Sequence, residues 1–101
     1  MRYEILTANR HNGEYITVVS GDMDKARKVA CQVAEKGLME REVFIRHAGM
    51  PGWTGYLGSV WKYDYADGKF MYIPDKAGKK PVWNVNPKTG KLTKKIGYKE
   101  W

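Results

Sequence analysis

The chain has 101 residues, of which 43% are hydrophobic and 13% are aromatic, and it carries a formal net charge of +7. A length of about 100 residues supports one domain and excludes two, and this composition excludes an intrinsically disordered chain. We therefore expect residues 1–101 to form a single domain with one hydrophobic core.

The positive charge is concentrated toward the C-terminus. Residues 1–73 contain ten Lys and Arg against nine Asp and Glu, a net of +1, whereas residues 74–101 contain eight Lys against two acids, a net of +6. We expect residues 74–101 to form a lysine-rich segment, either an edge hairpin or an extension. Such a segment is typical of attraction to phosphates or to an acidic protein surface, and equally of a tail that only aids solubility. Because its cations are all Lys, attraction to a phosphate backbone is favoured over reading of base edges.

The sequence indicates a cytoplasmic protein without a membrane-spanning segment. No apolar run of about 18 residues occurs, and the N-terminal residues lack the cationic and then apolar layout of a signal peptide. The single cysteine, Cys31, agrees with this location, because small secreted domains usually carry paired cysteines. We interpret Cys31 as a residue at the border of the core rather than a nucleophile.

The chain begins with two β-rich runs, residues 3–8 and 14–20. Between them, Asn12 and Gly13 form a strong tight-turn signal, which predicts a hairpin. Both faces of the two runs carry apolar side chains. We therefore expect this hairpin at the centre of a sheet rather than at its edge.

An amphipathic α-helix is predicted over residues 22–36. Asp22 can accept the free amide hydrogens of the first turn, and Gly37 can end the helix in a left-handed conformation. The apolar side is mostly Ala and Val, which suits close packing on a sheet, while charged residues and Gln occupy the other side. The apolar residues at helical spacing are Met23, Ala26, Val29, Ala30, Val33 and Ala34.

Three further strands are expected at residues 42–47, 59–65 and 69–73. Residues 48–58 contain four glycines and a proline, and we predict a loop there. The hairpin made by the last two strands is rich in aromatic side chains, which either pair across it or spread over both faces. These side chains are Trp61, Tyr63, Tyr65, Phe70 and Tyr72.

A third hairpin is predicted near the C-terminus, with strands at residues 82–85 and 92–96. The turn between them, at residues 86–91, has proline at its second position and glycine near its end. Together the elements predict an α+β fold, with a small, mostly antiparallel sheet of about five to seven strands in the order β-β-α-β-β-β and one packed helix. In element order this is similar to a β-grasp arrangement, where a helix crosses the sheet after the first hairpin, although a fold does not specify a function.

The sequence offers little for catalysis or metal binding. His11 and His47 have no partner at metal-ligand spacing, and we interpret them as a turn histidine and a strand-end histidine. Glu40 and Glu42 would share one face of a strand, but two surface acids without a further partner are a weak catalytic signal. The glycines of residues 52–58 lack the Lys-Ser/Thr ending of a phosphate loop. We expect no enzymatic activity, no metal and no cofactor.

Binding is better supported than catalysis. Ten of the thirteen aromatic residues lie between Trp53 and Trp101, interleaved with lysines. Proteins that bind single-stranded nucleic acid combine these features, because bases stack on rings while lysines follow the phosphates. The same rings can instead build the core of a small sheet. We expect a non-enzymatic binding protein whose basic, aromatic C-terminal surface engages nucleic acid or a nucleic-acid-handling protein complex.

The expected partner is nucleic acid, or an acidic or nucleic-acid-binding protein. An alternative function is a protein-binding inhibitor that acts by surface occlusion. Small single-domain chains without motifs are common among phage and mobile-element products that block host defence, including anti-CRISPR proteins, which this chain resembles in style and in no residue pattern. The residues expected to contact the partner are Trp53, Trp61, Trp83, Lys79, Lys80, Lys88, Lys91, Lys94 and Lys95.

Overall fold

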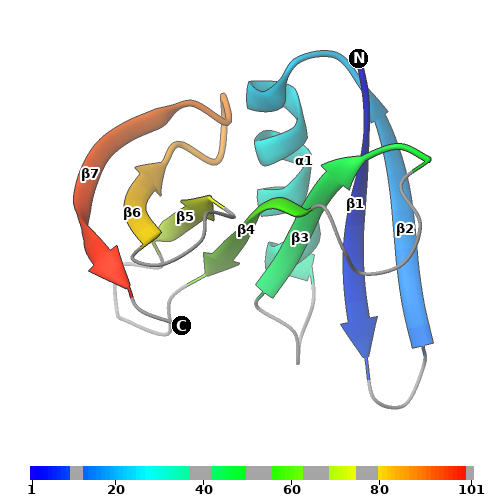
Figure 1. Ribbon diagram of the computed structural model, residues 1–101, viewed down its shortest axis with the longest axis horizontal. Coiled ribbons are helices and arrows are strands. Elements are labelled where there is room, and N and C mark those ends of the chain that lie inside the picture. The colour runs from blue at the N-terminus through cyan, green and yellow to red at the C-terminus, as the bar shows by residue number, and fades with distance from the viewer. Residues whose placement is uncertain (10–12, 37–41, 50–55, 63–68, 75–79, 100–101) are drawn as a thin grey trace.

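The structure of the protein is a computed structural model that describes residues 1–9, 13–36, 42–49, 56–62, 69–74 and 80–99. In these ranges the chain forms one α-helix and seven β-strands, which confirms the predicted α+β class (Figure 1). No described helix is long and apolar enough to cross a membrane. The elements are β1 (Arg2–Asn9), β2 (Gly13–Ser20), α1 (Met23–Lys36), β3 (Glu42–His47), β4 (Tyr56–Lys62), β5 (Phe70–Pro74), β6 (Lys80–Val85) and β7 (Leu92–Lys99).

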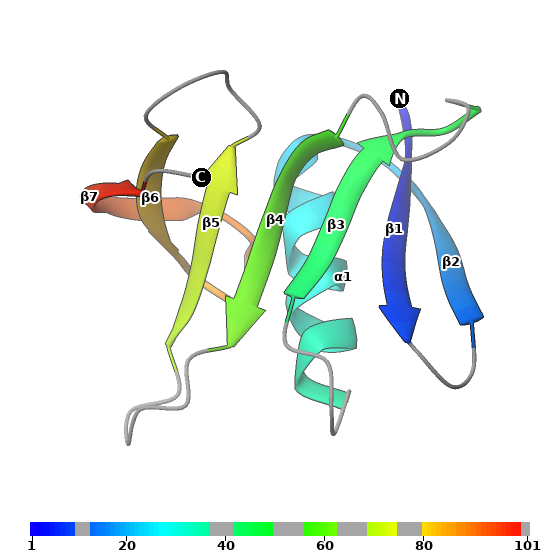
Figure 2. The same cartoon turned by 60° about the horizontal axis from the view of Figure 1, so that its bottom comes forward.

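The seven strands form one antiparallel sheet in the order β2-β1-β3-β4-β5-β6-β7. The helix α1 crosses one face, and the sheet curves around it so that β6 and β7 lie on the opposite side of α1 from β1 and β2 (Figure 1 and Figure 2). We call the face covered by α1 the helix face and the opposite face the outer face. The likeness to a β-grasp is limited to the order of the elements, because every strand pairing here is antiparallel.

The helix α1 begins and packs as its sequence predicts. The Lys25 amide donates a hydrogen bond to Oδ1 of Asp22 at 2.9 Å, so Asp22 caps the helix. The buried side is mostly alanine, whose small side chains let the helix approach the sheet closely. Strand residues that complete this core are Tyr3, Ile5, Val19, Val43, Ile45, Val60, Phe70, Tyr72 and Val85.

Cys31 lies inside this core, so the expectation from the sequence that it lies at the border of the core is wrong. Cys31 is almost fully buried between the helix and the sheet. Burial disfavours the charged thiolate and raises the pKa of the Cys31 thiol to about 12, although the nearby charge of Arg27 acts in the other direction. The thiol is therefore protonated at neutral pH.

The first hairpin is confirmed, but only one of its strands is central. β1 pairs with both β2 and β3, whereas no described strand pairs with the other side of β2. The prediction of a central position is therefore correct for β1 and wrong for β2. Ile16 and Val18 on the outer face of β2 are 49% and 48% exposed. Apolar residues on both faces of this run therefore do not mean that both faces are buried.

The predicted loop at residues 48–58 is wrong at its end, because β4 begins at Tyr56. Gly58 lies within the sheet, where it pairs with Ile45 on one side and Pro74 on the other. Its φ is +154°, and the ring of Tyr72 occupies the space into which a Cβ would project. A glycine is therefore required by close packing within a strand, although its sequence context is typical of a loop.

The aromatic residues of β4 and β5 are divided between the two faces. Phe70 and Tyr72 are buried on the helix face, which confirms a structural role for them, whereas Trp61 packs on the outer face in a second small cluster. Tyr63 and Tyr65 lie outside the described residues. The partners of Trp61 in the outer cluster are Met71, Ile73 and Val82.

The C-terminal hairpin belongs to the same sheet, and its turn packs on the helix. Asn86 donates a 2.9 Å hydrogen bond from its amide to the carbonyl of Lys91, which closes the predicted turn. Gly90 in this turn has a φ of +76°, and a Cβ there would overlap the carbonyl oxygen of Asp24 in the first turn of α1. The turn therefore lies directly against the start of the helix.

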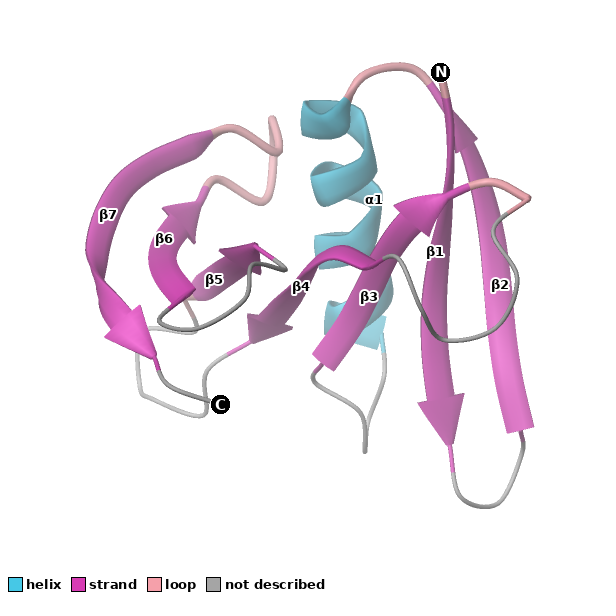
Figure 3. Ribbon diagram, in the orientation of Figure 1, coloured by secondary structure: helices cyan, strands magenta, loops and turns pink. Residues whose placement is uncertain are grey.

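Two irregularities bend β7. The pairing of β6 with β7 shifts twice, which leaves Thr93 and Ile96 of β7 without a directly opposed residue. Such bulges increase the local twist of a strand. The resulting curvature is visible in Figure 3, where β7 arches around the side of the molecule.

Arg27 joins the helix to this hairpin although it is charged and only 8% exposed. Its Nε donates a 2.7 Å hydrogen bond to the carbonyl of Gly90, and its Nη2 forms an ion pair with Asp24. The guanidinium also lies 5.2 Å from the ring centroid of Tyr72. The hydrogen bond, the carboxylate and the ring together compensate the desolvation of the charge.

Gly90 and Gly49 form a matched pair for testing the contact between turn and helix. Both have positive φ values, +76° and +87°, but nothing lies within 4 Å of a Cβ at Gly49. A left-handed alanine costs about 1 to 2 kcal/mol. We expect Gly49→Ala to lower the free energy of unfolding by that amount and Gly90→Ala to lower it at least twice as much. Urea denaturation measures both, and equal losses would contradict the contact.

The substitution Arg27→Lys keeps the charge but replaces the planar guanidinium with an ammonium that cannot maintain the same contacts. We expect the free energy of unfolding to fall by about 2 to 3 kcal/mol. The neighbouring exposed residue supplies a control, Lys28→Ala, which is expected to change it by less than about 0.5 kcal/mol. Chemical denaturation compares the two variants. Similarly small decreases in the free energy of unfolding for both variants would show that Arg27 does not anchor the hairpin.

Candidate functional site

The hairpin of β6 and β7 with its turn is strongly basic. Residues 80–99 contain six Lys and neither Asp nor Glu. The hairpin forms one edge of the sheet, and β7 is the outermost strand. We call residues 80–99 the basic hairpin. Its position at an edge leaves the outer side of β7 accessible to a partner.

Two adjacent lysines of β7 project to opposite faces of the basic hairpin. Lys94 lies opposite Asn84, and Lys95 lies opposite Trp83. Because Trp83 and Asn84 are consecutive in β6, their side chains point to opposite faces, and directly opposed residues share a face. The structure therefore brings these lysines to one edge without placing them on one flat surface.

The other lysines of the basic hairpin lie at its two ends. Lys88 and Lys91 are exposed in the turn, close to the start of α1. Lys80 lies at the opposite end, where it pairs with Lys99. The basic hairpin thus carries positive charge along its whole length.

Aromatic side chains accompany these lysines. Tyr98 in β7 is 52% exposed, and Nζ of Lys95 lies 4.3 Å from the centroid of its ring. Trp83 in β6 is half-buried and lies opposite Lys95. An exposed ring beside an ammonium group can contact a planar ligand on one side while the cation contacts an anion.

The remaining residues expected to contact a partner lie elsewhere. Trp61 is in β4 and packs on the outer face, as described above, so the structure does not bring it into the basic hairpin. Trp53 and Lys79 lie outside the described residues, and the structure assigns them no position. Of the nine expected residues, those that the structure brings together are Trp83, Lys80, Lys88, Lys91, Lys94 and Lys95.

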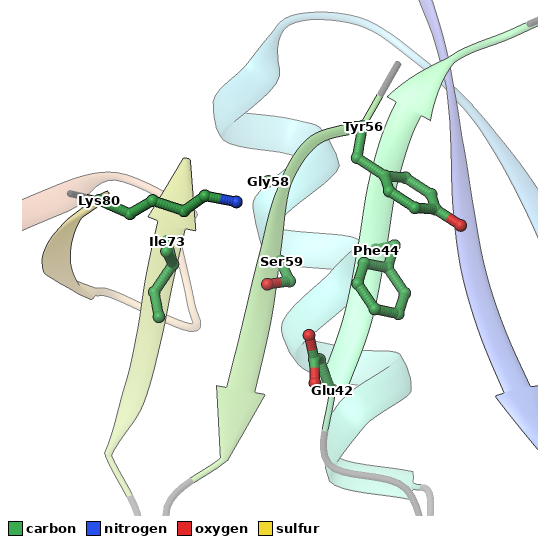
Figure 4. Close-up of a pocket in the computed structure, with 7 residues that line it drawn as sticks. All are labelled: Glu42, Phe44, Tyr56, Gly58, Ser59, Ile73 and Lys80. Carbon is green, nitrogen blue, oxygen red and sulfur yellow. The ribbon is translucent and has the colours of Figure 1, made fainter. Parts of the chain in front are cut away.

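A small slot lies on the outer face, over β4 and between the side chains of β3 and β5 (Figure 4). Its volume is about 130 Å³. Phe44 and Tyr56 form one wall, with ring centroids 4.7 Å apart and ring planes inclined by 25°. Ile73 forms the other wall, and Gly58 and Ser59 form the floor. We call this hollow the outer-face slot.

The two ends of the outer-face slot carry opposite charges. The side chain of Lys80 extends over the slot from β6, while the Glu42 carboxylate points toward Ser59 from the other end (Figure 4). Lys80 also belongs to the basic hairpin. The slot and the basic hairpin are therefore continuous through this one side chain.

The slot was not predicted from the sequence. It depends on the registers of β3, β4 and β5, which place Phe44 opposite Ser59 and Ser59 opposite Ile73. The available signal was one small residue, Ser59, inside a run of bulky ones. A small side chain leaves a gap when the residues opposite it on both neighbouring strands are large, as Phe44 and Ile73 are here.

An ion pair joins β1 and β3 near the N-terminus. Arg46 Nε donates a 2.7 Å hydrogen bond to Oε2 of Glu4, and the Gly49 amide donates one of 3.2 Å to Oε1. These hydrogen bonds stabilise the carboxylate, with that of Arg46 contributing most, and they hold the pKa of Glu4 below its ordinary value. Beside this pair, the ring of His47 stacks on Tyr3 at 5.5 Å. His47 is thus a packed strand-end residue.

Within the described ranges, no three or more His, Cys, Asp or Glu side chains are grouped so that they could hold a metal ion. His11 and Glu40 lie outside these ranges.

The lowered pKa of Glu4 predicts that the folded state loses stability in acid. The ion pair contributes stability above the ordinary carboxyl pKa of 4.5, and this contribution is lost as the pH falls through the lower pKa of the folded state. We expect Glu4→Gln to be less stable than the wild type near neutral pH and to lose less stability on acidification. Urea denaturation between about pH 7 and about pH 2 tests this. An unchanged pH dependence in the variant would contradict it.

Comparison of the chain with protein-family models, curated proteins and solved structures found no match. The basic hairpin and the outer-face slot are therefore the features from which a function is inferred.

Proposed function

We propose that this protein is a non-enzymatic binding protein that engages single-stranded nucleic acid through the basic hairpin, whose own contacts depend little on base sequence. The observation that carries the proposal is the concentration of six Lys without a single acid in an edge hairpin that also presents Trp83 and Tyr98. A cytoplasmic location belongs to the same proposal.

The charge of the hairpin supports binding to the phosphate backbone. Each lysine that neutralises a phosphate releases a condensed counterion, which makes this contact favourable at low salt and independent of sequence. Lysine presents a compact charge on a flexible stem and not the rigid fork of arginine, so it suits phosphate attraction better than base reading. The exposed lysines of the turn and of β7 are Lys88, Lys91, Lys94 and Lys95.

The exposed ring of Tyr98 supports a preference for single strands. A base can stack on an aromatic side chain only when it has left its neighbours in a duplex. Lys95 lies against the same ring and can meet the adjoining phosphate. Ring and ammonium together match the alternation of base and phosphate along one strand.

A second candidate function is recognition of a protein, and the opposite edge of the sheet favours it. β2 pairs with β1 without interruption from Ser20 to Gly13, and it exposes Ile16 and Val18. A regular edge strand with exposed apolar side chains can accept another strand. An inhibitor that occludes a partner's surface would use this edge.

The test of the proposed function is fluorescence anisotropy of labelled single-stranded and duplex DNA, titrated with the full chain at several salt concentrations. We expect single strands to bind more tightly than duplexes, with an affinity that falls as salt rises. Lys94→Ala should reduce the slope of log affinity against log salt by about 0.7. Lys36→Ala removes the same charge from the far end of α1 and should leave the slope unchanged. Equal effects of the two variants would contradict a site on the basic hairpin.

Replacement of Tyr98 separates stacking from charge. We expect Tyr98→Ala to weaken binding by about 1 to 3 kcal/mol while the salt slope stays the same, since no cation is lost. The same anisotropy titrations measure both quantities. Absence of binding by the wild type at low salt would overturn the proposed function and leave protein recognition as the candidate.

A further inference from the structure

We propose that the outer-face slot binds a single pyrimidine base bearing an amino group, namely cytosine, from the single-stranded nucleic acid that the basic hairpin holds. This inference rests on the proposed function and adds to it a base preference at one position. It follows from the size of the slot, from its walls and from the charges at its two ends.

The size of the slot selects one flat ring. Phe44 and Ile73, on its two opposite walls, stand on β3 and β5, which are separated by two strand spacings of about 4.8 Å each. Between them, β4 contributes the backbone of Gly58 and the small side chain of Ser59, while Tyr56 at the start of β4 stands beside Phe44. The gap is therefore the space that a larger side chain at position 59 would fill. Its volume of about 130 Å³ is close to that of cavities that hold one benzene ring, of about 150 Å³, so a pyrimidine fits better than a purine.

The walls provide surfaces that a ring can pack against. Phe44 and Tyr56 present a stacked aromatic pair on one side, and Ile73 presents an aliphatic side chain on the other. Base stacking on aromatic side chains does not by itself discriminate between bases. The walls therefore account for binding of a base, and the ends of the slot must account for its identity.

The ends distinguish cytosine from thymine or uracil. Glu42 is an acceptor at one end, and the exocyclic amino group of cytosine is a donor whose hydrogen bond a carboxylate can accept. Thymine and uracil present a carbonyl oxygen at the corresponding position, which a carboxylate repels. Lys80 lies at the other end and links the slot to the basic hairpin, where it can contact the phosphate of the same nucleotide (Figure 4).

The test compares labelled oligonucleotides of ten deoxycytidines and of ten thymidines, which have equal charge and length. We expect the wild type to bind the cytidine oligomer at least about fivefold more tightly. Glu42→Gln should remove this preference, because an amide both donates and accepts. Ser59→Phe should fill the slot with its own ring and also remove the preference, whereas Ser59→Ala keeps the slot open and should retain it.

The outcomes separate this inference from the proposed function. Equal binding of both oligomers, with sensitivity to Lys94→Ala retained, would overturn the slot and leave the function of the basic hairpin in place. Absence of oligonucleotide binding by the wild type would overturn the proposed function.

A second measurement examines the slot alone. Cytidine monophosphate should shift the ring proton resonances of Phe44 and Tyr56 in NMR spectra, and uridine monophosphate should shift them less. Larger shifts with cytidine monophosphate than with uridine monophosphate, in a protein that also binds the oligonucleotides, support the inference. Equal shifts with the two nucleotides, or shifts only with N-acetylphenylalanine amide, would overturn it, and the latter would identify the slot as a site for a protein side chain.

Discussion

The buried guanidinium of Arg27 is the interaction on which the arrangement of the sheet depends. It lies on the helix, but its hydrogen bond reaches the carbonyl of Gly90 in the β6–β7 turn, and it packs over the ring of Tyr72 in β5. A buried charge is costly unless it is paired and hydrogen-bonded. The C-terminal hairpin must therefore stay closed on the helix for this charge to be satisfied, and the missing side chain of Gly90 makes that approach possible.

Closure of the sheet around α1 determines where binding can occur. The helix face of β1 to β5 is filled by the core, including Phe70 and Tyr72, so its aromatic side chains are not available to a partner. The outer face and the two edges remain. On the outer face Trp61 covers a small apolar cluster, and the slot beside it exists because Ser59, between Phe44 and Ile73, has a small side chain.

The two edges of the sheet differ in their physical character. β2 is regular along its whole length and presents exposed Ile16 and Val18, whereas β7 carries two bulges and a series of lysines. Bulges and lysines on an edge strand discourage pairing with other strands. The lysines of β7 therefore have a structural explanation beside the proposed contact with phosphates, and the two roles are compatible because both use charge at an unpaired edge.

The sequence by itself determined the features that depend on neighbouring residues. The helical period and cap of residues 22–36, the turn at residues 86–91 and the uneven distribution of charge are local properties, and the α+β class follows from the series of elements. Tertiary structure alone decided which strands are neighbours, and therefore the edge position of β2 and the outer-face slot. It also decided the burial of Arg27, whose hydrogen-bond partner is 63 residues away. Alternation along a strand specifies that side chains point to two faces, but it does not specify which strand lies alongside, because register and pairing are set by contacts between distant residues.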